Sequence, residues 1–317
     1  MVNIVVTRKE AKEITTNPGW ALVFGRRKVG KTFMIQNFVP HDAYFHVRSD
    51  RSITARGIVL DVIPDFATFS KLTTTYLKSG KTVVVDEFQR LPPNLLEDLT
   101  AVHPGGRLIL TGSSMRVANE LLGGNSPLLG LLRPFNIGQI AASDILKGTA
   151  SSLGAEEAVW TASALRDPWI IPFYRPGESL ENLCQTVKYV VPGLIGEIFT
   201  EDERTLTRTY SSILSLVGAG YEDYRDIAGV LFSRGIVKNG TSSSVLPYMA
   251  NMVDMGLLEV IRRSDDKRKV YRIPSFPVRL HYYLDSRYGI SERDFVYSEV
   301  KQAAEDLARK AIEELVA

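Results

Sequence analysis

Residues 20–32, which decide the fold, read Trp20-Ala-Leu-Val-Phe-Gly-Arg-Arg-Lys-Val-Gly-Lys-Thr32. The apolar run at residues 20–24 predicts a buried strand, and residues 31–38 predict a helix directly after it. The segment between them fits G-x-x-x-x-G-K-[ST], the pattern of a phosphate-binding P-loop that joins a strand to a helix. Glycines let the backbone wrap a phosphate, and the amides at the helix start favour its negative charge.

This loop also predicts the ligand. Lys31 is expected to reach the β- and γ-phosphates of ATP, or the β-phosphate of ADP, and to assist catalysis, and the Thr32 hydroxyl is expected to bind Mg²⁺. A glycine-rich turn without function can show the same pattern, so a second motif has to decide. The residues that we assign to nucleotide binding here are Gly25, Arg26, Arg27, Lys28, Val29, Gly30, Lys31 and Thr32.

The second motif is Val83-Val-Val-Asp86-Glu87. A buried strand delivers Asp86 to its carboxyl end, where open α/β sheets bind ligands. Asp86 is expected to hold Mg²⁺, and Glu87 to orient and polarise the attacking water as the catalytic base. Two acids after three valines are also typical of a strand that ends in solvent. Downstream of a P-loop, however, they indicate ATP hydrolysis.

A third apolar strand, residues 107–111, ends in the hydroxyl-rich segment Thr111-Gly-Ser-Ser114. In P-loop proteins with an extra strand between the P-loop strand and the strand of the acids, a polar residue here senses the γ-phosphate. We predict this role for Thr111, with Ser113 as the second candidate. The alternative is turn and capping chemistry, for which glycine and serine are both suited.

The first part of the chain alternates strands with helices, which predicts an α/β fold with a parallel sheet covered on both faces. Together with the motifs, this indicates a P-loop NTPase core of the additional-strand, catalytic-glutamate class over residues 1–145. The strands are expected at residues 20–24, 43–47, 82–85, 107–111 and 135–140, and the helices at 31–38, 69–77, 94–102 and 114–122.

The rest of the chain has other patterns. Helices expected at residues 155–165 and 179–190 predict an all-helical lid over residues 146–204. Three helices and two strands then predict a winged helix over residues 205–290, and residues 291–317 predict an amphipathic helix. Within the winged helix, the helices are expected at residues 210–217, 224–234 and 241–255, and the strands at 257–261 and 270–273.

The hairpin at residues 262–269 holds five basic and two acidic residues, and on a winged helix it predicts contacts with the phosphates of double-stranded DNA. The third helix has neither Arg nor Lys, which is unusual for a helix that reads a major groove. A solvated hairpin, an internal latch or a protein-docking surface is the alternative. The basic residues are Arg262, Arg263, Lys267, Arg268 and Lys269.

The amino-acid sequences of several motifs resemble those of the archaeal STAND-type P-loop ATPases, which are relatives of the AAA+ proteins. The segments that carry the resemblance are Phe24-Gly-Arg-Arg-Lys-Val-Gly-Lys-Thr32, Val85-Asp-Glu-Phe-Gln89, Leu110-Thr-Gly-Ser-Ser114, Pro127-Leu-Leu-Gly130, and Arg8 with Glu10 before the first strand. The family combines an ATPase core, a helical lid and a winged helix, so the resemblance covers most of the chain.

Two further site residues come only from this resemblance. The family has an arginine directly after its Pro-Leu-Tyr-Gly segment, whereas Leu131 stands here and Arg133 is the nearby candidate for catalysis. A solvated arginine on a strand edge is the alternative for Arg133. The family's lid carries Gly-x-Pro against the adenine. Here Val190-Val-Pro192 retains only the proline, so Pro192 is the expected adenine contact.

The composition is that of a globular protein, with 317 residues, 44% hydrophobic and 23% charged. The net charge of +2 does not by itself indicate a nucleic-acid partner. Cys184 is the one cysteine, so no intramolecular disulfide can form. No stretch has the about 20 apolar residues of a membrane helix, and we expect a cytoplasmic protein without membrane contact.

The leading hypothesis is an ATP-driven molecular switch that hydrolyses ATP slowly and carries a regulatory winged helix. The alternative is an ATP-controlled DNA-binding regulator or DNA-processing ATPase that uses the basic hairpin. A protein partner or self-association fits either one. A small-molecule kinase is disfavoured because Glu87 suits water activation, and a GTPase because no N-K-x-D guanine motif occurs.

Overall fold

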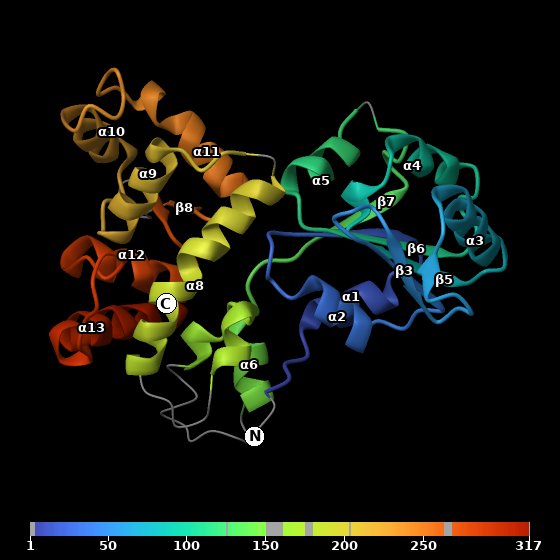
Figure 1. Cartoon of the computed structure of the whole chain (residues 1–317), viewed down its shortest axis with the longest axis horizontal. Helices are drawn as coiled ribbons and strands as arrows, with labels where there is room; N and C mark the ends of the chain where they lie inside the picture. Colours follow the sequence, from blue (N-terminus) through green and yellow to red (C-terminus); the bar gives the residue numbers. More distant parts are fainter. Residues whose placement is uncertain are drawn as a thin grey trace. The chain divides into compact units, whose positions relative to one another are not determined.

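A computed structural model describes residues 4–124, 126–149, 161–174, 180–202, 204–262 and 268–316. The contacts within the chain divide it into two compact units. One is Thr7–Gly138, and the other is Gln139–Ala317 together with Met1–Val6. Figure 1 shows the strands of the first unit in blue to green and the helices of the second in green to red. The finer division at residues 145, 204 and 290 stays a prediction.

The first unit is built on a seven-stranded sheet in the order β4-β3-β2-β5-β6-β1-β7. The pairs β2–β5, β5–β6, β6–β1 and β1–β7 are parallel, while β3 and β4 run antiparallel at one end. Strand β6 lies between the P-loop strand β1 and the acidic strand β5, which confirms the additional-strand class. The strands are β1 Trp20–Phe24, β2 Ala43–Val47, β3 Ile53–Arg56, β4 Val62–Ile63, β5 Thr82–Asp86, β6 Arg107–Gly112 and β7 Leu132–Asn136.

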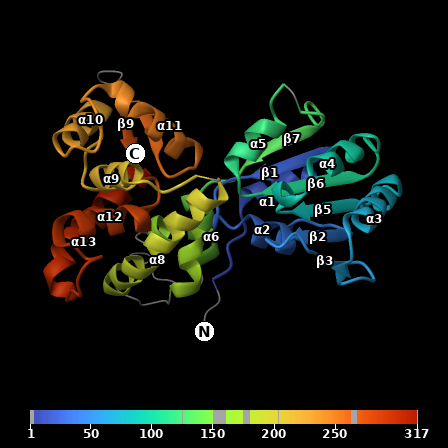
Figure 2. The same ribbon diagram turned by 45° about the horizontal axis from the view of Figure 1, so that its top comes forward.

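Helices cover both faces of this sheet (Figure 2). Side chains of α1 and α2 form one apolar cluster with Val84 of β5, and side chains of α3, α4 and α5 form the other with Val83 and Val85. Consecutive strand residues point to opposite faces, so the valine run before Asp86 supplies both clusters. The helices are α1 Lys9–Thr16, α2 Lys31–Phe38, α3 Phe66–Lys78, α4 Pro93–Thr100 and α5 Met115–Leu121.

The last strand of this sheet differs from the prediction. It was expected at residues 135–140 and lies at Leu132–Asn136, with Leu132 opposite Trp20. Pro134 argues against an internal strand, but β7 is an edge strand, where a proline removes no ladder hydrogen bond. Helix α1 and the short antiparallel strands β3 and β4 were not predicted.

The second unit is mainly helical around a single apolar cluster. It contains α6 Ala142–Thr149, the 3-10 helix η2 Pro168–Phe173, α8 Leu180–Glu201, α9 Arg208–Gly218, α10 Tyr224–Ser233, the 3-10 helix η3 Ser242–Ser244, α11 Leu246–Asp254, the strands β8 Glu259–Arg262 and β9 Lys269–Arg272, α12 Phe276–Tyr288 and α13 Tyr297–Val316. The helix predicted at residues 155–165 lies mostly outside the described residues.

Several elements of this unit differ from the predictions, and β8 and β9 are shifted by one or two residues from the expected strands. Helix α8 continues past residue 190 through Pro192, because buried Val191, Leu194 and Ile195 extend its apolar face on both sides of the exposed proline. The helix expected at residues 241–255 is a 3-10 turn followed by α11, which has Pro247 in its first turn, where the missing amide costs little. Helix α12 was missed, and the terminal helix α13 begins at Tyr297 rather than at residue 291.

The predicted order of three helices and a hairpin is present as α9, α10, α11, β8 and β9. Cys184 lies buried on α8. Within the described part of the chain, no helix is both long enough and apolar enough to cross a membrane.

Candidate functional site

The strand register gathers the motif residues at one edge of the sheet. Asp86 at the end of β5 lies opposite Thr111 of β6 and opposite His46 of β2. Phe24, the last residue of β1 before the P-loop, lies opposite Gly112. Because these strands are parallel, the P-loop, the acids and the hydroxyl-rich segment all follow strand ends at the same edge.

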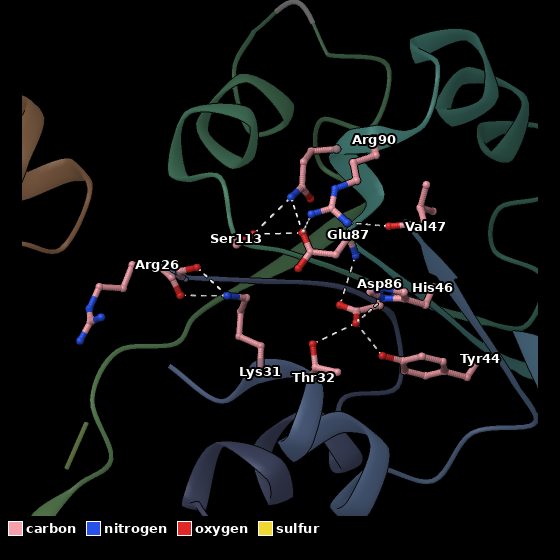
Figure 3. A network of polar contacts seen from close by, with 12 residues as sticks. Arg26, Lys31, Thr32, Tyr44, His46, Val47, Asp86, Glu87, Arg90 and Ser113 are labelled. Atoms are coloured by element: carbon pink, nitrogen blue, oxygen red, sulfur yellow. Dashed lines mark hydrogen bonds and ion pairs between the residues drawn. The ribbon is translucent and has the colours of Figure 1, made fainter. Parts of the chain in front are cut away.

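The P-loop has the backbone that its glycines allow. Gly25 lies so close to the residue after β7 that an added Cβ would stand 2.0 Å from the Ile137 carbonyl oxygen, and Gly30 precedes α2 with φ of 85°. Lys28 also has a positive φ, 66°, which is uncommon for a residue with a side chain. The Lys31 ammonium donates to the carbonyls of Gly25 at 2.7 Å and Arg26 at 3.0 Å, inside the loop (Figure 3).

Arg8 ties the P-loop to the neighbouring segment after β7. Its guanidinium is buried and donates to the Val29 carbonyl at 2.8 Å and to the Gly138 carbonyl at 3.0 Å. Glu10 accepts from the same guanidinium at 3.3 Å. The sequence pointed to Arg8 and Glu10 only through the family resemblance, whereas the structure shows that Arg8 holds two loops together.

Asp86 is fully buried, and its carboxylate is surrounded by donors (Figure 3). Its Oδ2 accepts from the Thr32 hydroxyl at 2.9 Å and the Tyr44 hydroxyl at 2.6 Å, and lies 3.1 Å from Nδ1 of His46. Burial favours the neutral acid, but the hydrogen bonds from His46, Tyr44 and Thr32 outweigh it and hold the pKa of Asp86 below its usual value. Burial and the nearby Asp86 charge raise the pKa of Tyr44.

Thr32 and Asp86 fit a magnesium ion. Both offer oxygen atoms, the ligands that this hard cation prefers, and the hydrogen bond between them holds the two side chains together. Mg²⁺ keeps most of its water shell and is usually bound through one or two protein oxygens together with the phosphates of its nucleotide. The pair therefore offers the donor set that a magnesium nucleotide requires.

Glu87 is held by three neighbours on one of its oxygens. Its Oε2 accepts from Nε2 of Gln89 at 2.6 Å and from the Ser113 hydroxyl at 3.0 Å, and lies 3.6 Å from a guanidinium nitrogen of Arg90. Glu87 has the positive φ of 58°, at the start of the 3-10 helix η1 Phe88–Arg90. This turn brings Gln89 and Arg90 back toward the carboxylate two and three residues before them.

The two candidate sensors have different surroundings. Ser113 contacts Glu87, whereas the Thr111 hydroxyl is buried and has no hydrogen-bond partner among the described residues. Thr111 lies beside Asp86 in the sheet register, so both residues are next to the acids. The sensor role of Thr111 stays a prediction, and Ser113 is the one of the two that contacts the expected base.

Three other expected site residues are Arg133, Arg26 and Pro192. Arg133 is exposed in β7 opposite Ala21, with its guanidinium 5.2 Å from the centre of the Phe135 ring. Arg26 is buried, and Figure 3 shows its side chain pointing away from Lys31. Pro192 is exposed on α8 in the second unit. A contact of Arg133 with phosphate and one of Pro192 with adenine stay predictions.

The basic hairpin is only partly described. Arg262 ends β8 and pairs with Lys269, the first residue of β9, and both are exposed. Arg268 precedes β9 and is also exposed. Arg263 and Lys267 lie outside the described residues.

Four contributors to the site were not predicted from the sequence. Tyr44 and His46 alternate along β2, so both face the same side of the sheet, but only the pairing of β2 with β5 brings them to Asp86. Gln89 and Arg90 follow Glu87 directly, and the turn of η1 directs them to its carboxylate. A signal for Tyr44 and His46 was available in the spacing of two along a strand.

Comparison with known proteins rests on structure. No family model matches the chain, and no curated protein is similar to it in sequence. The ORC2 protein of Aeropyrum pernix, solved as ADPNP–ADP complexes, has a TM-score of 0.50 at 13% identity over 92% of this chain and 95% of that one. The chain has the fold of the AAA+ P-loop ATPases. At this identity the similarity shows the fold alone.

Two further structures are less similar. The ORC1 protein of Aeropyrum pernix in complex with DNA has a TM-score of 0.37 at 13% identity, over 92% of this chain and 95% of that one. A STAND protein with a tetratricopeptide repeat sensor from Pyrococcus horikoshii has a TM-score of 0.39 at 17% identity. The match covers this whole chain and 49% of the STAND protein.

Proposed function

We propose that this chain binds ATP with Mg²⁺ and hydrolyses it slowly, as a molecular switch. The observation that carries the proposal is the position of Asp86 and Glu87 at one sheet edge. Asp86 accepts a hydrogen bond from Thr32 of the P-loop, whereas Glu87 accepts from other donors, among them Ser113. Two adjacent acids with different partners suit two different tasks, ion binding and water activation.

In the proposed reaction, the P-loop amides and the Lys31 ammonium bind the β- and γ-phosphates. Thr32 and Asp86 hold the magnesium ion, which, when bound, offsets the negative charge on those phosphates. Glu87 orients the attacking water and accepts its proton. Slow turnover and the switch role follow from the resemblance to STAND-type ATPases.

The test measures ATP binding and ATP turnover separately. Glu87→Gln keeps the shape of the side chain but removes the base, so it should bind ATP with Mg²⁺ as wild type does and lose about 10²–10⁴ in turnover. Lys31→Ala should weaken ATP binding at least tenfold, because it removes a charge-assisted contact worth about 1.5–3 kcal/mol. Equal turnover by wild type and Glu87→Gln would refute the catalytic role of Glu87.

DNA binding is the second candidate. It is supported by the exposed cations Arg262, Arg268 and Lys269, which lie where β8 ends and β9 begins. Helix α11 contains neither Arg nor Lys, which argues against readout of bases by that helix. If the chain binds DNA, we expect contacts with phosphates and weak sequence specificity. A protein-docking or self-association role for the same hairpin is the competing proposal.

A further inference from the structure

The two oxygens of the Glu87 carboxylate have unlike surroundings. The contacts with Gln89, Ser113 and Arg90 all go to Oε2, and Oε1 accepts no hydrogen bond from the part of the chain that the structure describes. In Figure 3 the Glu87 oxygen that meets the dashed line to Ser113 is Oε2, and the other oxygen, Oε1, lies on the side of Lys31. The side chain is therefore fixed through one oxygen and presents the other.

The donors to Oε2 come from two directions and support one another. Gln89 approaches from η1, Ser113 follows β6, and the Gln89 amide nitrogen also lies 3.3 Å from the Ser113 hydroxyl. The Arg90 guanidinium is anchored by a hydrogen bond of 2.9 Å to the Val47 carbonyl at the end of β2. Glu87 is thus held by contacts that lead to β2 and β6, the strands on both sides of β5.

The backbone at Glu87 allows this arrangement. Its φ of 58° and ψ of 40° turn the chain sharply, so that η1 passes back over the strand end. A left-handed conformation is unfavourable in a residue with a side chain and persists only when its surroundings maintain it. The contacts of Gln89 and Arg90 with the Glu87 carboxylate help to maintain this backbone conformation.

We propose that Gln89 is a positioning residue for ATP hydrolysis, which, with Ser113, fixes Oε2 of Glu87 so that Oε1 faces the attacking water. The proposal rests on the proposed ATPase function. A glutamate free to rotate spends little time in the productive orientation, and a small misplacement of a catalytic group can cost about 10²-fold in rate. Gln89 itself contacts neither the water nor the nucleotide in this proposal.

The step that depends on this orientation is hydrolysis of the β–γ bond. The water oxygen forms a bond to the γ-phosphorus while the bond from that phosphorus to the bridging oxygen breaks. ADP leaves with the electron pair, one proton of the water passes to Oε1 of Glu87, and inorganic phosphate is the second product. No oxidant, reductant or further reactant is required.

The test compares kcat and KM for ATP in wild type, Gln89→Leu and Ser113→Ala. Gln89→Leu removes the donor and keeps much of the volume, so we expect kcat to fall about 10–100-fold while KM and ATP affinity stay within about threefold. In Ser113→Ala, kcat should fall by less, since the hydrogen bond from Gln89 to Glu87 remains. Gln302→Leu is the matched control, because exposed Gln302 donates to the carboxylate of Asp306 within helix α13, and it should leave kcat unchanged.

A double variant separates positioning from a general loss of structure. If Gln89 acts through Glu87, Gln89→Leu should have almost no further effect on kcat in a Glu87→Gln background, since residues that act as a unit are not additive. Multiplied losses in the double variant would overturn the proposal. The proposal would also be overturned if the kcat of Gln89→Leu equalled that of wild type. A kcat above that of wild type would overturn it too, because Gln89 would then restrain Glu87 in an unproductive orientation.

Failure of the proposed function gives a different result. If wild type and Glu87→Gln have the same turnover, the ATPase proposal fails before Gln89 is examined. If wild type hydrolyses ATP and Glu87→Gln does not, but Gln89→Leu matches wild type, only the positioning role fails. ATP binding by Gln89→Leu, measured by calorimetry, verifies in either case that the variant is folded.

Discussion

The hydroxyl of Tyr44 donates a hydrogen bond of 2.6 Å to Oδ2 of Asp86, from the neighbouring strand β2 to the end of β5. Both residues are buried, so the carboxylate charge is stabilised by protein donors in place of water. Tyr44 is therefore part of the environment that keeps Asp86 ionised, although it belongs to no recognised motif.

Replacing Tyr44 tests that relationship. Tyr44→Phe should lower the free energy of unfolding at pH 7 by about 1.5–3 kcal/mol, the range for a hydrogen bond to a charged group. Chemical denaturation measures the loss. Tyr221→Phe is the control, because Tyr221 is exposed, and it should change stability by less than about 0.5 kcal/mol. A loss of similar size in both variants would contradict a special role of the contact with Asp86.

The left-handed backbone of Lys28 predicts an unusual order of substitutions. Glycine has no steric cost at φ of 66°, but it is more flexible in the unfolded chain, and the two effects nearly cancel. Lys28→Gly should therefore stay within about 0.5 kcal/mol of wild type in unfolding free energy. Lys28→Val should lose more than about 1 kcal/mol, because a β-branched residue fits this conformation worst. Equal stability of the two variants would contradict the observed backbone.

His281 predicts a dependence of stability on pH. It is buried on α12, and burial lowers its pKa below the usual 6.5. The unfolded chain therefore binds a proton near pH 6.5 that the folded chain does not, so stability falls as pH decreases through this region, by at most about 1.4 kcal/mol per pH unit for one group.

His281→Gln cannot titrate and should remove this part of the pH dependence. Urea denaturation at pH 7.5 and 5.5 gives the comparison, with wild type losing more stability on acidification than the variant. The substitution leaves every other residue of the chain in place, so the difference between the two proteins isolates the contribution of His281. An unchanged pH dependence in His281→Gln would show that His281 is not the group responsible.

The basic hairpin gives a prediction about salt. If it binds DNA, neutralising its five cations should flatten the slope of log affinity against log salt by up to about 4 units, near 0.9 per lost phosphate contact. The substituted residues are Arg262, Arg263, Lys267, Arg268 and Lys269. Gel-shift titration at several salt concentrations measures the slope. If the hairpin is a latch, the same variant should change the basal ATPase rate and leave DNA affinity unaltered.

The sequence by itself determined the parts of the site that are contiguous. A P-loop and a pair of acids after a valine run carry their meaning in neighbouring residues, because local backbone and side-chain chemistry are set within a few positions. The additional strand was recognised in the same way, from an apolar run that ends in hydroxyls, and the sheet order confirms it.

Only the tertiary structure decided which side chains surround the two acids. Tyr44, His46 and Ser113 reach Asp86 or Glu87 because β2 and β6 pair with β5, and strand pairing over long distances leaves no local pattern. Packing likewise overrode local preference where α8 continues through Pro192. The two acids can be recognised from their neighbours in sequence. The orientation of their side chains depends on residues that come together only when β2 and β6 pair with β5.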